Sequence, residues 1–224
     1  MDDVVLSAPL FAGIDPDAAK ALLASMSRVD LGRGQVLFHE GDRGDRLYVI
    51  SRGKVKLGRR APDGRENLLS VLGPGEMFGE LSIFDPGPRT ATATAVGDAR
   101  LLELSQDELV TWVERYPAVA KHLLAALARR LRRTNEALAD LVFSDVPGRV
   151  AKALLDLSTR FGQPVEDGVR VAHDLTQEEL AQLIGASRET VNKALADFTA
   201  RGWLRRDGRA IVILDMARLE RRAR

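Results

Sequence analysis

The stretch from residue 116 to residue 143 reads YPAVAKHLLAALARRLRRTNEALADLVF, with no glycine and with no proline after Pro117. Apolar residues recur along it every three to four positions, which places them on one face of a helix. The positions of this a/d seam are Leu124, Leu127, Leu131, Thr134, Leu138 and Leu141. The flank carries four arginines that would keep the helix soluble: Arg129, Arg130, Arg132 and Arg133. We therefore expect one long helix here.

Two interpretations of the seam stay open. The helix could pack against its own domain, or it could pair with the same helix of a second chain. Thr134 occupies a d position with Asn135 beside it, and polar groups at a buried seam are costly unless something pairs with them. A partner chain, a ligand or both could do so. We favour a dimerisation helix.

The composition is that of an ordinary globular protein. Of the 224 residues, 45% are hydrophobic, and the net charge is +1. The chain has no cysteine, which excludes disulfides, thiolate-held iron–sulfur clusters and cysteine-ligated haem. We find no signal peptide and no apolar run long enough to span a membrane. The expectation is a soluble, cytoplasmic protein without a membrane partner.

Residues 29–105 have the pattern of a small β domain. Short apolar runs alternate with glycines, and Ala-Pro-Asp-Gly at residues 61–64 is a hairpin turn signal. The expected strands are residues 36–38, 47–50, 54–57, 68–71 and 101–104. Many short strands at this spacing indicate a jelly-roll or another small barrel. Before them, Asp15 is the expected N-cap of a helix that begins at Pro16 and ends at Met26.

One segment interrupts this β pattern: FGELSIFDPGPRTA, residues 78–91. A glycine turn leads into about one helical turn, whose free N–H groups could bind an anion. Arg89 returns nine residues after Glu80 and could clamp the same anion through two N–H groups. The carboxylate of Glu80 suits sugar hydroxyls, so the segment indicates recognition of a sugar phosphate. The alternative is a surface loop with an ion pair between Glu80 and Arg89.

A helix-turn-helix is predicted from DLTQEELAQLIGASRETVNKAL, residues 174–195. Thr176 and Glu179 form a capping box, Gly185 allows the sharp turn, and Ser187 caps the second helix. The buried face of that helix would carry Val191, Leu195 and Phe198. The opposite, exposed face would carry Arg188, Glu189, Asn192 and Lys193, which suits a reader of the major groove. The alternative is a solvated face on an ordinary helical hairpin.

A hairpin around Asp207-Gly208 follows, which makes the domain a winged helix. Its arginines are expected near phosphates: Arg205, Arg206 and Arg209. Before the helix-turn-helix, we expect a break at residues 144–148, a helix at 149–161, a loop at 162–168 and a short strand at 169–171.

Gly79-Glu80-Leu81 with Pro88-Arg89-Thr90-Ala91 resembles the phosphate-binding cassette of cyclic-nucleotide-binding domains. Residues 187–191, Ser-Arg-Glu-Thr-Val, resemble the recognition-helix core of the cyclic-AMP receptor protein (CRP/FNR) family. Together the two resemblances cover nearly the whole chain. Residues 59–67 and 85–90 resemble the actinobacterial branch of this family.

The resemblance implies cAMP as the effector and assigns roles residue by residue. Glu80 would hold the ribose 2′-hydroxyl, Arg89 and Thr90 the cyclic phosphate, with the Gly79 and Leu81 backbones nearby. Thr134 and Asn135 would contact adenine, one from each chain of the dimer; the family often has a serine at the position of Asn135.

The resemblance also implies the DNA contacts. The residues expected there are Thr176, Ser187, Arg188, Glu189, Asn192, Lys193 and Arg209. Lys193 stands where the family has a second arginine.

We thus expect an α+β protein with four parts. Residues 1–115 would form the cyclic-nucleotide-binding β jelly-roll, 116–143 the dimerisation helix, 144–148 a hinge, and 149–224 a winged helix-turn-helix. The expected function is a homodimeric, cAMP-responsive transcription regulator, activating or repressing. It would bind a near-palindromic DNA operator whose two half-sites lie about one helical turn apart, and the resemblance implies TGTGA-like half-sites. The family also suggests contact with RNA polymerase.

Two alternatives differ in class or ligand. An enzyme on a jelly-roll core is disfavoured, because His39, His122 and His173 are scattered and show neither a metal-ligand spacing nor a nucleophile with its base. We expect no metal. The other alternative is a regulator that responds to another nucleotide or to haem, or that binds DNA largely without ligand.

Overall fold

The computed structural model describes residues 3–61, 64 and 66–223. It divides into two compact units, one made of residues 1–64 and 69–132, the other of residues 65–68 and 133–224. The helix α5 (Ala118–Phe143) contributes to both.

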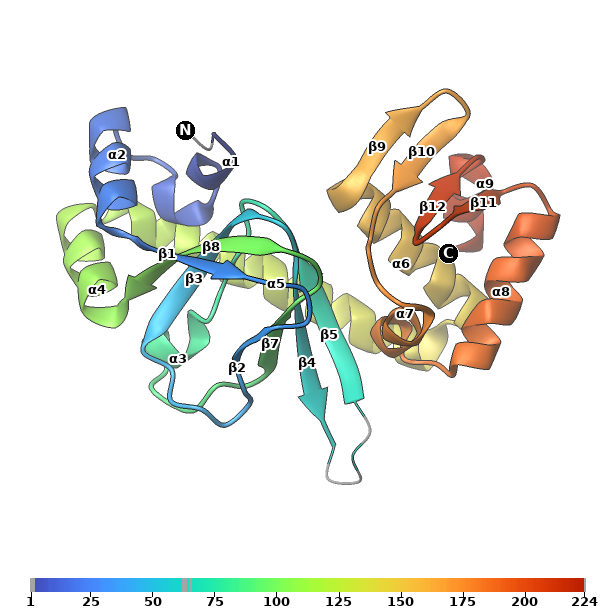
Figure 1. The fold of residues 1–224 in the computed structure, drawn as a ribbon, viewed down its shortest axis with the longest axis horizontal. Coiled ribbons are helices and arrows are strands. Elements are labelled where there is room, and N and C mark those ends of the chain that lie inside the picture. The colour runs from blue at the N-terminus through green and yellow to red at the C-terminus, as the bar shows by residue number, and fades with distance from the viewer. Residues whose placement is uncertain (1–2, 62–63, 65, 224) are drawn as a thin grey trace. The chain divides into compact units, whose positions relative to one another are not determined.

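Two four-stranded sheets form the centre of the first unit (Figure 1). One has the order β1-β8-β3-β6 and the other β2-β7-β4-β5. The strands are β1 (Ser27–Leu31), β2 (Val36–Phe38), β3 (Arg46–Arg52), β4 (Val55–Arg60), β5 (Glu66–Leu72), β6 (Met77–Phe78), β7 (Thr92–Ala95) and β8 (Ala99–Ser105). The strands pair antiparallel, as in a jelly-roll, in the pairs β1–β8, β2–β7, β3–β6, β3–β8 and β4–β7. One hydrophobic cluster, with Ile50, Phe78 and Leu101, fills the space between them.

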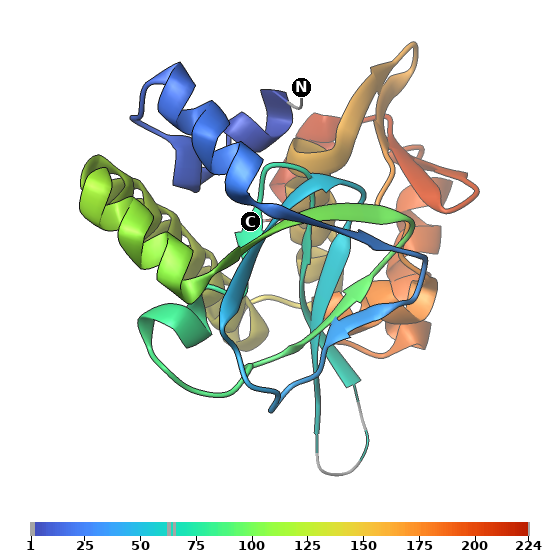
Figure 2. The same cartoon turned by 60° about the vertical axis from the view of Figure 1, so that its left-hand side comes forward.

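Helices cover one end of this β-structure, as both views in Figures 1 and 2 show. They are α1 (Asp3–Leu6), the 3-10 helix η1 (Pro9–Phe11), α2 (Pro16–Ser25), α3 (Leu81–Phe84), α4 (Gln106–Arg115) and the first turns of α5. A second cluster joins Leu10, Leu104, Trp112 and Leu123. Burial of these large apolar side chains stabilises the arrangement.

The second unit contains the end of α5, four further helices and a small sheet. The helices are α6 (Val146–Phe161), α7 (Gln177–Ile184), α8 (Arg188–Ala200) and α9 (Met216–Arg222). The sheet has the order β11-β12-β10-β9, with β9 (Gly162–Val165), β10 (Gly168–Val171), β11 (Leu204–Asp207) and β12 (Ala210–Ile213). Its core includes Leu154, Leu180, Phe198 and Leu219.

The predicted mixture of a β-rich N-terminal part, a long helix and a C-terminal helix-turn-helix is confirmed. The predicted strands are found as β2, β3, β4, β5 and β8. Asp15 caps α2 through two backbone N–H groups, as expected. The turn predicted at residues 61–64 includes Pro62 and Asp63, which lie outside the described residues.

Other boundaries were wrong or missed. Residues 162–165 form β9, not a loop, because they pair with β10. Helix α6 begins at Val146, three residues earlier than expected, because Asp145 caps it and Pro147 lies in its first turn. Helix α4 was not predicted, although Ser105 and Glu108 form a capping box at its start.

Candidate functional site

The segment at residues 78–91 folds as a turn, a short helix and a returning strand. Gly79 has φ +83°, and a Cβ there would lie 2.9 Å from the carbonyl oxygen of Arg46, so the position requires glycine. Glu80 follows directly and precedes α3. Only 1% of Glu80 is exposed.

The two carboxylate oxygens of Glu80 are used differently. Oε1 accepts a hydrogen bond from Nη1 of Arg130 on α5, at 2.8 Å. Oε2 is buried and has no hydrogen-bond partner among the described residues. A buried charge with one free oxygen is costly, so a ligand hydroxyl that donates to Oε2 would stabilise it.

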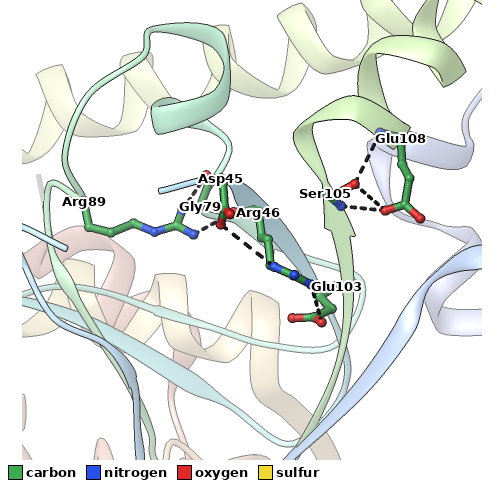
Figure 3. A network of polar contacts seen from close by, with 7 residues as sticks. All are labelled: Asp45, Arg46, Gly79, Arg89, Glu103, Ser105 and Glu108. Carbon is green, nitrogen blue, oxygen red and sulfur yellow. Dashed lines mark hydrogen bonds and ion pairs between the residues drawn. The ribbon is translucent and has the colours of Figure 1, made fainter. Parts of the chain in front are cut away.

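Arg89 is buried as well, with 4% exposed. Its guanidinium donates to the carbonyl oxygens of Gly79 (2.8 Å) and Arg46 (2.9 Å), as Figure 3 shows. Its Cζ lies 4.3 Å from the centroid of the Phe38 ring, within the range of a cation–π contact. The Nε–H is buried and is bonded to nothing in the part of the chain that the structure describes.

Burial lowers the pKa of the Arg89 guanidinium from its ordinary value, while neighbouring groups such as Tyr48, Asp45 and Glu80 act in the opposite direction. An arginine stays protonated in proteins even so. The cassette therefore contains a buried cation and a buried anion, each with an unused hydrogen-bonding atom. The interpretation of this segment as a surface loop with a Glu80–Arg89 ion pair is wrong: both residues are buried, and the ion pair of Glu80 is with Arg130.

The backbone that holds Arg89 is itself anchored (Figure 3). The Arg46 side chain donates to Glu103 on β8 at 2.7 Å and lies 3.9 Å from Asp45. These contacts fix the strand whose carbonyl group accepts from Arg89. Ser105 and Glu108 in the same figure are the capping box of α4, and the bonds from Ser105 lower the pKa of Glu108.

The other residues expected to bind cAMP are placed as follows. Leu81 and Thr90 are exposed beside the buried pair. Thr134 and Asn135 follow Arg130 by four and five positions on α5, are exposed, and belong to the second unit. Their contact with adenine stays a prediction.

Most of the a/d seam of α5 is exposed in the part of the chain that the structure describes. Leu124 is 66% exposed, and Leu131 and Leu138 are each 62% exposed. Leu141 and Thr134 are also exposed, and Leu127 is half-buried. A row of exposed leucines is unusual for a monomer, and this observation disfavours packing of the seam against its own domain.

The helix-turn-helix has the predicted local chemistry. Thr176 and Glu179 form the capping box of α7, Gly185 has φ +70°, and the Ser187 side chain accepts from the backbone N–H of Thr190 at the start of α8. The buried face carries Val191, Leu195 and Phe198, as expected.

The opposite face of α8 differs from the prediction at one residue. Arg188, Glu189 and Lys193 are exposed, and Lys193 forms an ion pair with Glu189 at 2.7 Å. Asn192, expected to be exposed, is half-buried and donates from Nδ2 to Gln177 on α7 at 3.1 Å. The neighbouring helix covers it, which a pattern along α8 alone does not reveal.

The hairpin β11–β12 carries the three arginines that were expected to lie near phosphates. Arg206 and Arg209 are exposed, and Arg209 lies in the turn between the strands. Arg205 instead forms an ion pair with Asp167 at 2.7 Å. On the next strand, Arg170 pairs with Asp207 and holds the pKa of that carboxyl below its ordinary value.

Within the described ranges, no group of three His, Cys, Asp or Glu side chains could hold a metal ion. No helix there is long and apolar enough to cross a membrane.

Three residues of the cassette were not found from the sequence. Arg130 was interpreted only as a solubilising flank and Phe38 only as a strand residue, and Arg46 was assigned no role. Each acts on a residue at least 43 positions away, and no local pattern carries such a signal.

Two protein-family models match this chain. The cyclic nucleotide-binding domain matches residues 28–116, and the Crp-like helix-turn-helix domain matches residues 148–222. Among curated proteins, the chain is 58% identical over 224 residues to a CRP-like cAMP-activated global transcriptional regulator of Mycobacterium tuberculosis, with all of both chains covered. It is 38% identical to the cyclic AMP receptor protein of Thermus thermophilus, over 95% of each chain.

Solved structures of other regulators are also similar to this chain. The match to the Thermus thermophilus catabolite activator protein covers 96% of this chain and 98% of that one, at 38% identity and a TM-score of 0.56. A c-di-GMP responsive global regulator from Xanthomonas campestris reaches a TM-score of 0.76 at 27% identity; the match covers 89% of this chain and 99% of that one.

The fold and the site thus define the class that joins a cyclic nucleotide-binding domain to a Crp-like helix-turn-helix domain. The chain belongs to the cyclic-AMP receptor protein family, in its actinobacterial branch. The Mycobacterium tuberculosis relative is named a transcriptional regulator and not an enzyme, and the C-terminal match is to a helix-turn-helix domain, so the enzyme alternative is set aside.

Proposed function

We propose that this protein is a homodimeric transcription regulator that binds cAMP in its N-terminal unit and DNA through α8. The observation that carries the proposal is the buried pair in the cassette. Glu80 and Arg89 each keep a buried polar atom that has no hydrogen-bond partner among the described residues, and a cyclic ribose phosphate offers a hydroxyl to one and an anion to the other.

The proposed roles in the pocket follow from this chemistry. Glu80, held by Arg130, accepts from the ribose 2′-hydroxyl. Arg89 turns part of its guanidinium from the Gly79 and Arg46 carbonyl groups to the cyclic phosphate, and the exposed Thr90 adds a hydroxyl donor. Thr134 and Asn135 on α5 contact adenine, one from each chain.

The exposed seam of α5 supports a dimer. Two copies would bury the leucines that one copy leaves exposed, in the manner of a two-stranded coiled coil. In this proposal the segment from 116 to 143 is the dimerisation helix, and residues 144–148 act as the hinge between the parts that bind the ligand and the DNA.

The exposed face of α8 supports reading of the major groove. Arg188 would donate two hydrogen bonds to a guanine, and Glu189 would accept from a cytosine amine. A dimer would read two TGTGA-like half-sites one helical turn apart. Such a regulator works on chromosomal DNA, hence in the cytoplasm, and it would activate or repress transcription through contact with RNA polymerase.

The mechanism is a population shift. Ligand binding beside α5 would favour one arrangement of hinge and DNA-binding domain, and this requires different cAMP affinities for the two arrangements. Calorimetry with cAMP, cGMP and c-di-GMP tests the ligand. We expect cAMP to bind most tightly. If cAMP fails to bind and another nucleotide binds, the effector assignment falls and the regulator class remains.

A further inference from the structure

The short helix α9 lies against the start of α6. Leu219 on α9 is fully buried. Gly148, in the first turn of α6, is also buried, and a Cβ there would lie 2.9 Å from Oδ1 of Asp145 and 3.3 Å from Nη1 of Arg222. The two helices are thus packed closely at the point where α6 leaves α5.

Asp145 is engaged on both carboxylate oxygens at this point. Oδ1 accepts from the backbone N–H of Gly148 at 2.9 Å and caps α6. Oδ2 accepts from Nη2 of Arg222 at 2.5 Å. One carboxylate therefore joins the first turn of α6 to the last turn of α9.

The same junction is tied to the turn of the helix-turn-helix. Arg149 donates from Nη1 to the carbonyl oxygen of Ser144 at 2.8 Å and from Nη2 to that of Gly185 at 3.2 Å. Gly185 lies between α7 and α8. A displacement at the start of α6 would therefore be transmitted to the helix that carries Arg188.

We propose that Arg222 is a positioning residue: through Asp145, α9 holds the start of α6 so that it moves as one piece with the helix-turn-helix. This inference rests on the proposed cAMP-dependent binding of DNA. The Arg222 side chain is 32% exposed and that of Asp145 62%, so the ion pair adds little to global stability. The ion pair acts instead on geometry. Without it, the cap of α6 at Asp145 is held less firmly, and the hinge at residues 144–148 can move without moving α8.

The test uses the full-length protein and compares Arg222→Ala with wild type. Operator affinity is measured with and without cAMP, and the ratio of the two is the coupling. Arg222→Ala should lower this ratio at least about threefold, out of the roughly 5- to 150-fold typical of such couplings, while calorimetry shows cAMP affinity within about twofold of wild type. Arg222→Lys, which keeps the charge, should restore most of it.

Arg221→Ala is the matched control, because Arg221 is exposed on the same helix and has no ion pair within the residues described. Asp145→Asn keeps a side-chain oxygen for the cap but removes the charge that Arg222 binds. In a protein that already carries Asp145→Asn, adding Arg222→Ala should not lower the ratio of operator affinities any further. Equal coupling in wild type and Arg222→Ala, or equal losses in Arg222→Ala and Arg221→Ala, would overturn the proposal.

Thermal unfolding separates this proposal from the function on which it rests. The hydrogen bond from Arg222, then that from Gly148, lower the pKa of Asp145, and the charge of Arg149 acts in the same direction. The stability from this contact is therefore present above about pH 4 and is lost as the pH falls through the lowered pKa. At pH 7, Arg222→Ala can lower Tm through this contact only while Asp145 carries its charge. If Arg222→Ala lowers Tm equally when Asp145→Asn is also present, the ion pair between Arg222 and Asp145 is excluded as the cause. If wild type shows no cAMP dependence at all, the proposed function fails instead.

Discussion

The two units of this protein hold their functional charges in opposite ways. In the first, Glu80 and Arg89 are buried, Glu80 is bonded to Arg130, and Arg89 is bonded to the carbonyl oxygens of Gly79 and Arg46. In the second, Arg188, Glu189 and Lys193 stand exposed at the start of α8. A buried charge suits a small ligand that supplies the missing hydrogen bonds, whereas exposed charges suit a large polyanion met in water.

The difference also determines what substitution does. Removing a buried charge leaves its partner unsatisfied and acts on one ligand. Removing an exposed one should, under the proposed function, change discrimination among DNA sequences with little effect on the fold. The seam of α5 is a third kind of surface, because its exposed side chains are apolar.

The largest effect is expected at the seam. Leu131→Asp puts an unpaired charge into the dimer interface from both copies, at a cost of roughly 3–5 kcal/mol. Each chain should stay folded, because Leu131 is exposed in the single chain. Sedimentation at micromolar concentration should show a monomer. Arg132→Asp places the same carboxylate side chain outside the seam and should leave the dimer intact; an unchanged dimer mass for Leu131→Asp would remove the seam from the interface.

Arg89→Leu should abolish cAMP binding while the dimer persists. A phosphate without its guanidinium loses a charge-assisted pair, about 2–5 kcal/mol. Calorimetry should show affinity falling at least about tenfold. The exposed Arg52 provides the control Arg52→Leu, and wild-type affinity in Arg89→Leu would exclude Arg89 from the pocket.

Arg188→Ala should flatten base preference at one position of the operator. A bidentate contact to guanine discriminates by about 1–3 kcal/mol. Operators with one symmetric substitution per position would be compared at fixed salt. Wild type should tolerate more substitution under Lys193, whose amine is flexible and is bonded to Glu189. Sharpest discrimination under Lys193, or an equal loss on all sequences in Arg188→Ala, would show that another face reads the DNA.

The smallest effect is expected at Phe38. Phe38→Leu removes the ring that lies 4.3 Å from the Arg89 guanidinium, which is worth about 0.5–2 kcal/mol. The affinity for cAMP should fall by roughly 2- to 30-fold by calorimetry, less than in Arg89→Leu. Phe38→Tyr keeps the ring face and should keep the affinity. Equal binding by Phe38→Leu and wild type would mean that the ring does not position Arg89.

The sequence patterns were most accurate for structural features that depend on residues close together in the chain. The caps at Asp15, Thr176 and Ser187, the left-handed Gly185 and the buried face of α8 all depend on residues within a few positions. Strands with small or mixed residues were missed. Residues 92–95 read Thr-Ala-Thr-Ala, which has no large apolar side chain, yet they pair with both β2 and β4.

The sequence did not predict the contacts between residues that lie far apart in the chain. The sequence identified Glu80 and Arg89 as a pair, but it did not show that Arg130 binds Glu80 or that the Arg46 carbonyl group binds Arg89. Asn192 was placed on the exposed face by its position on the helix, and Gln177 on another helix determines its actual environment. These facts depend on packing between elements.

The central claim is that binding in the buried site changes binding at the exposed one. The most direct measurement is the affinity of the wild-type dimer for a near-palindromic TGTGA-like operator, at fixed salt, with and without saturating cAMP. We predict that cAMP raises this affinity by about 5- to 150-fold, and that cGMP raises it less. Equal operator affinity with and without cAMP, in a protein that calorimetry shows to bind cAMP, would contradict the account.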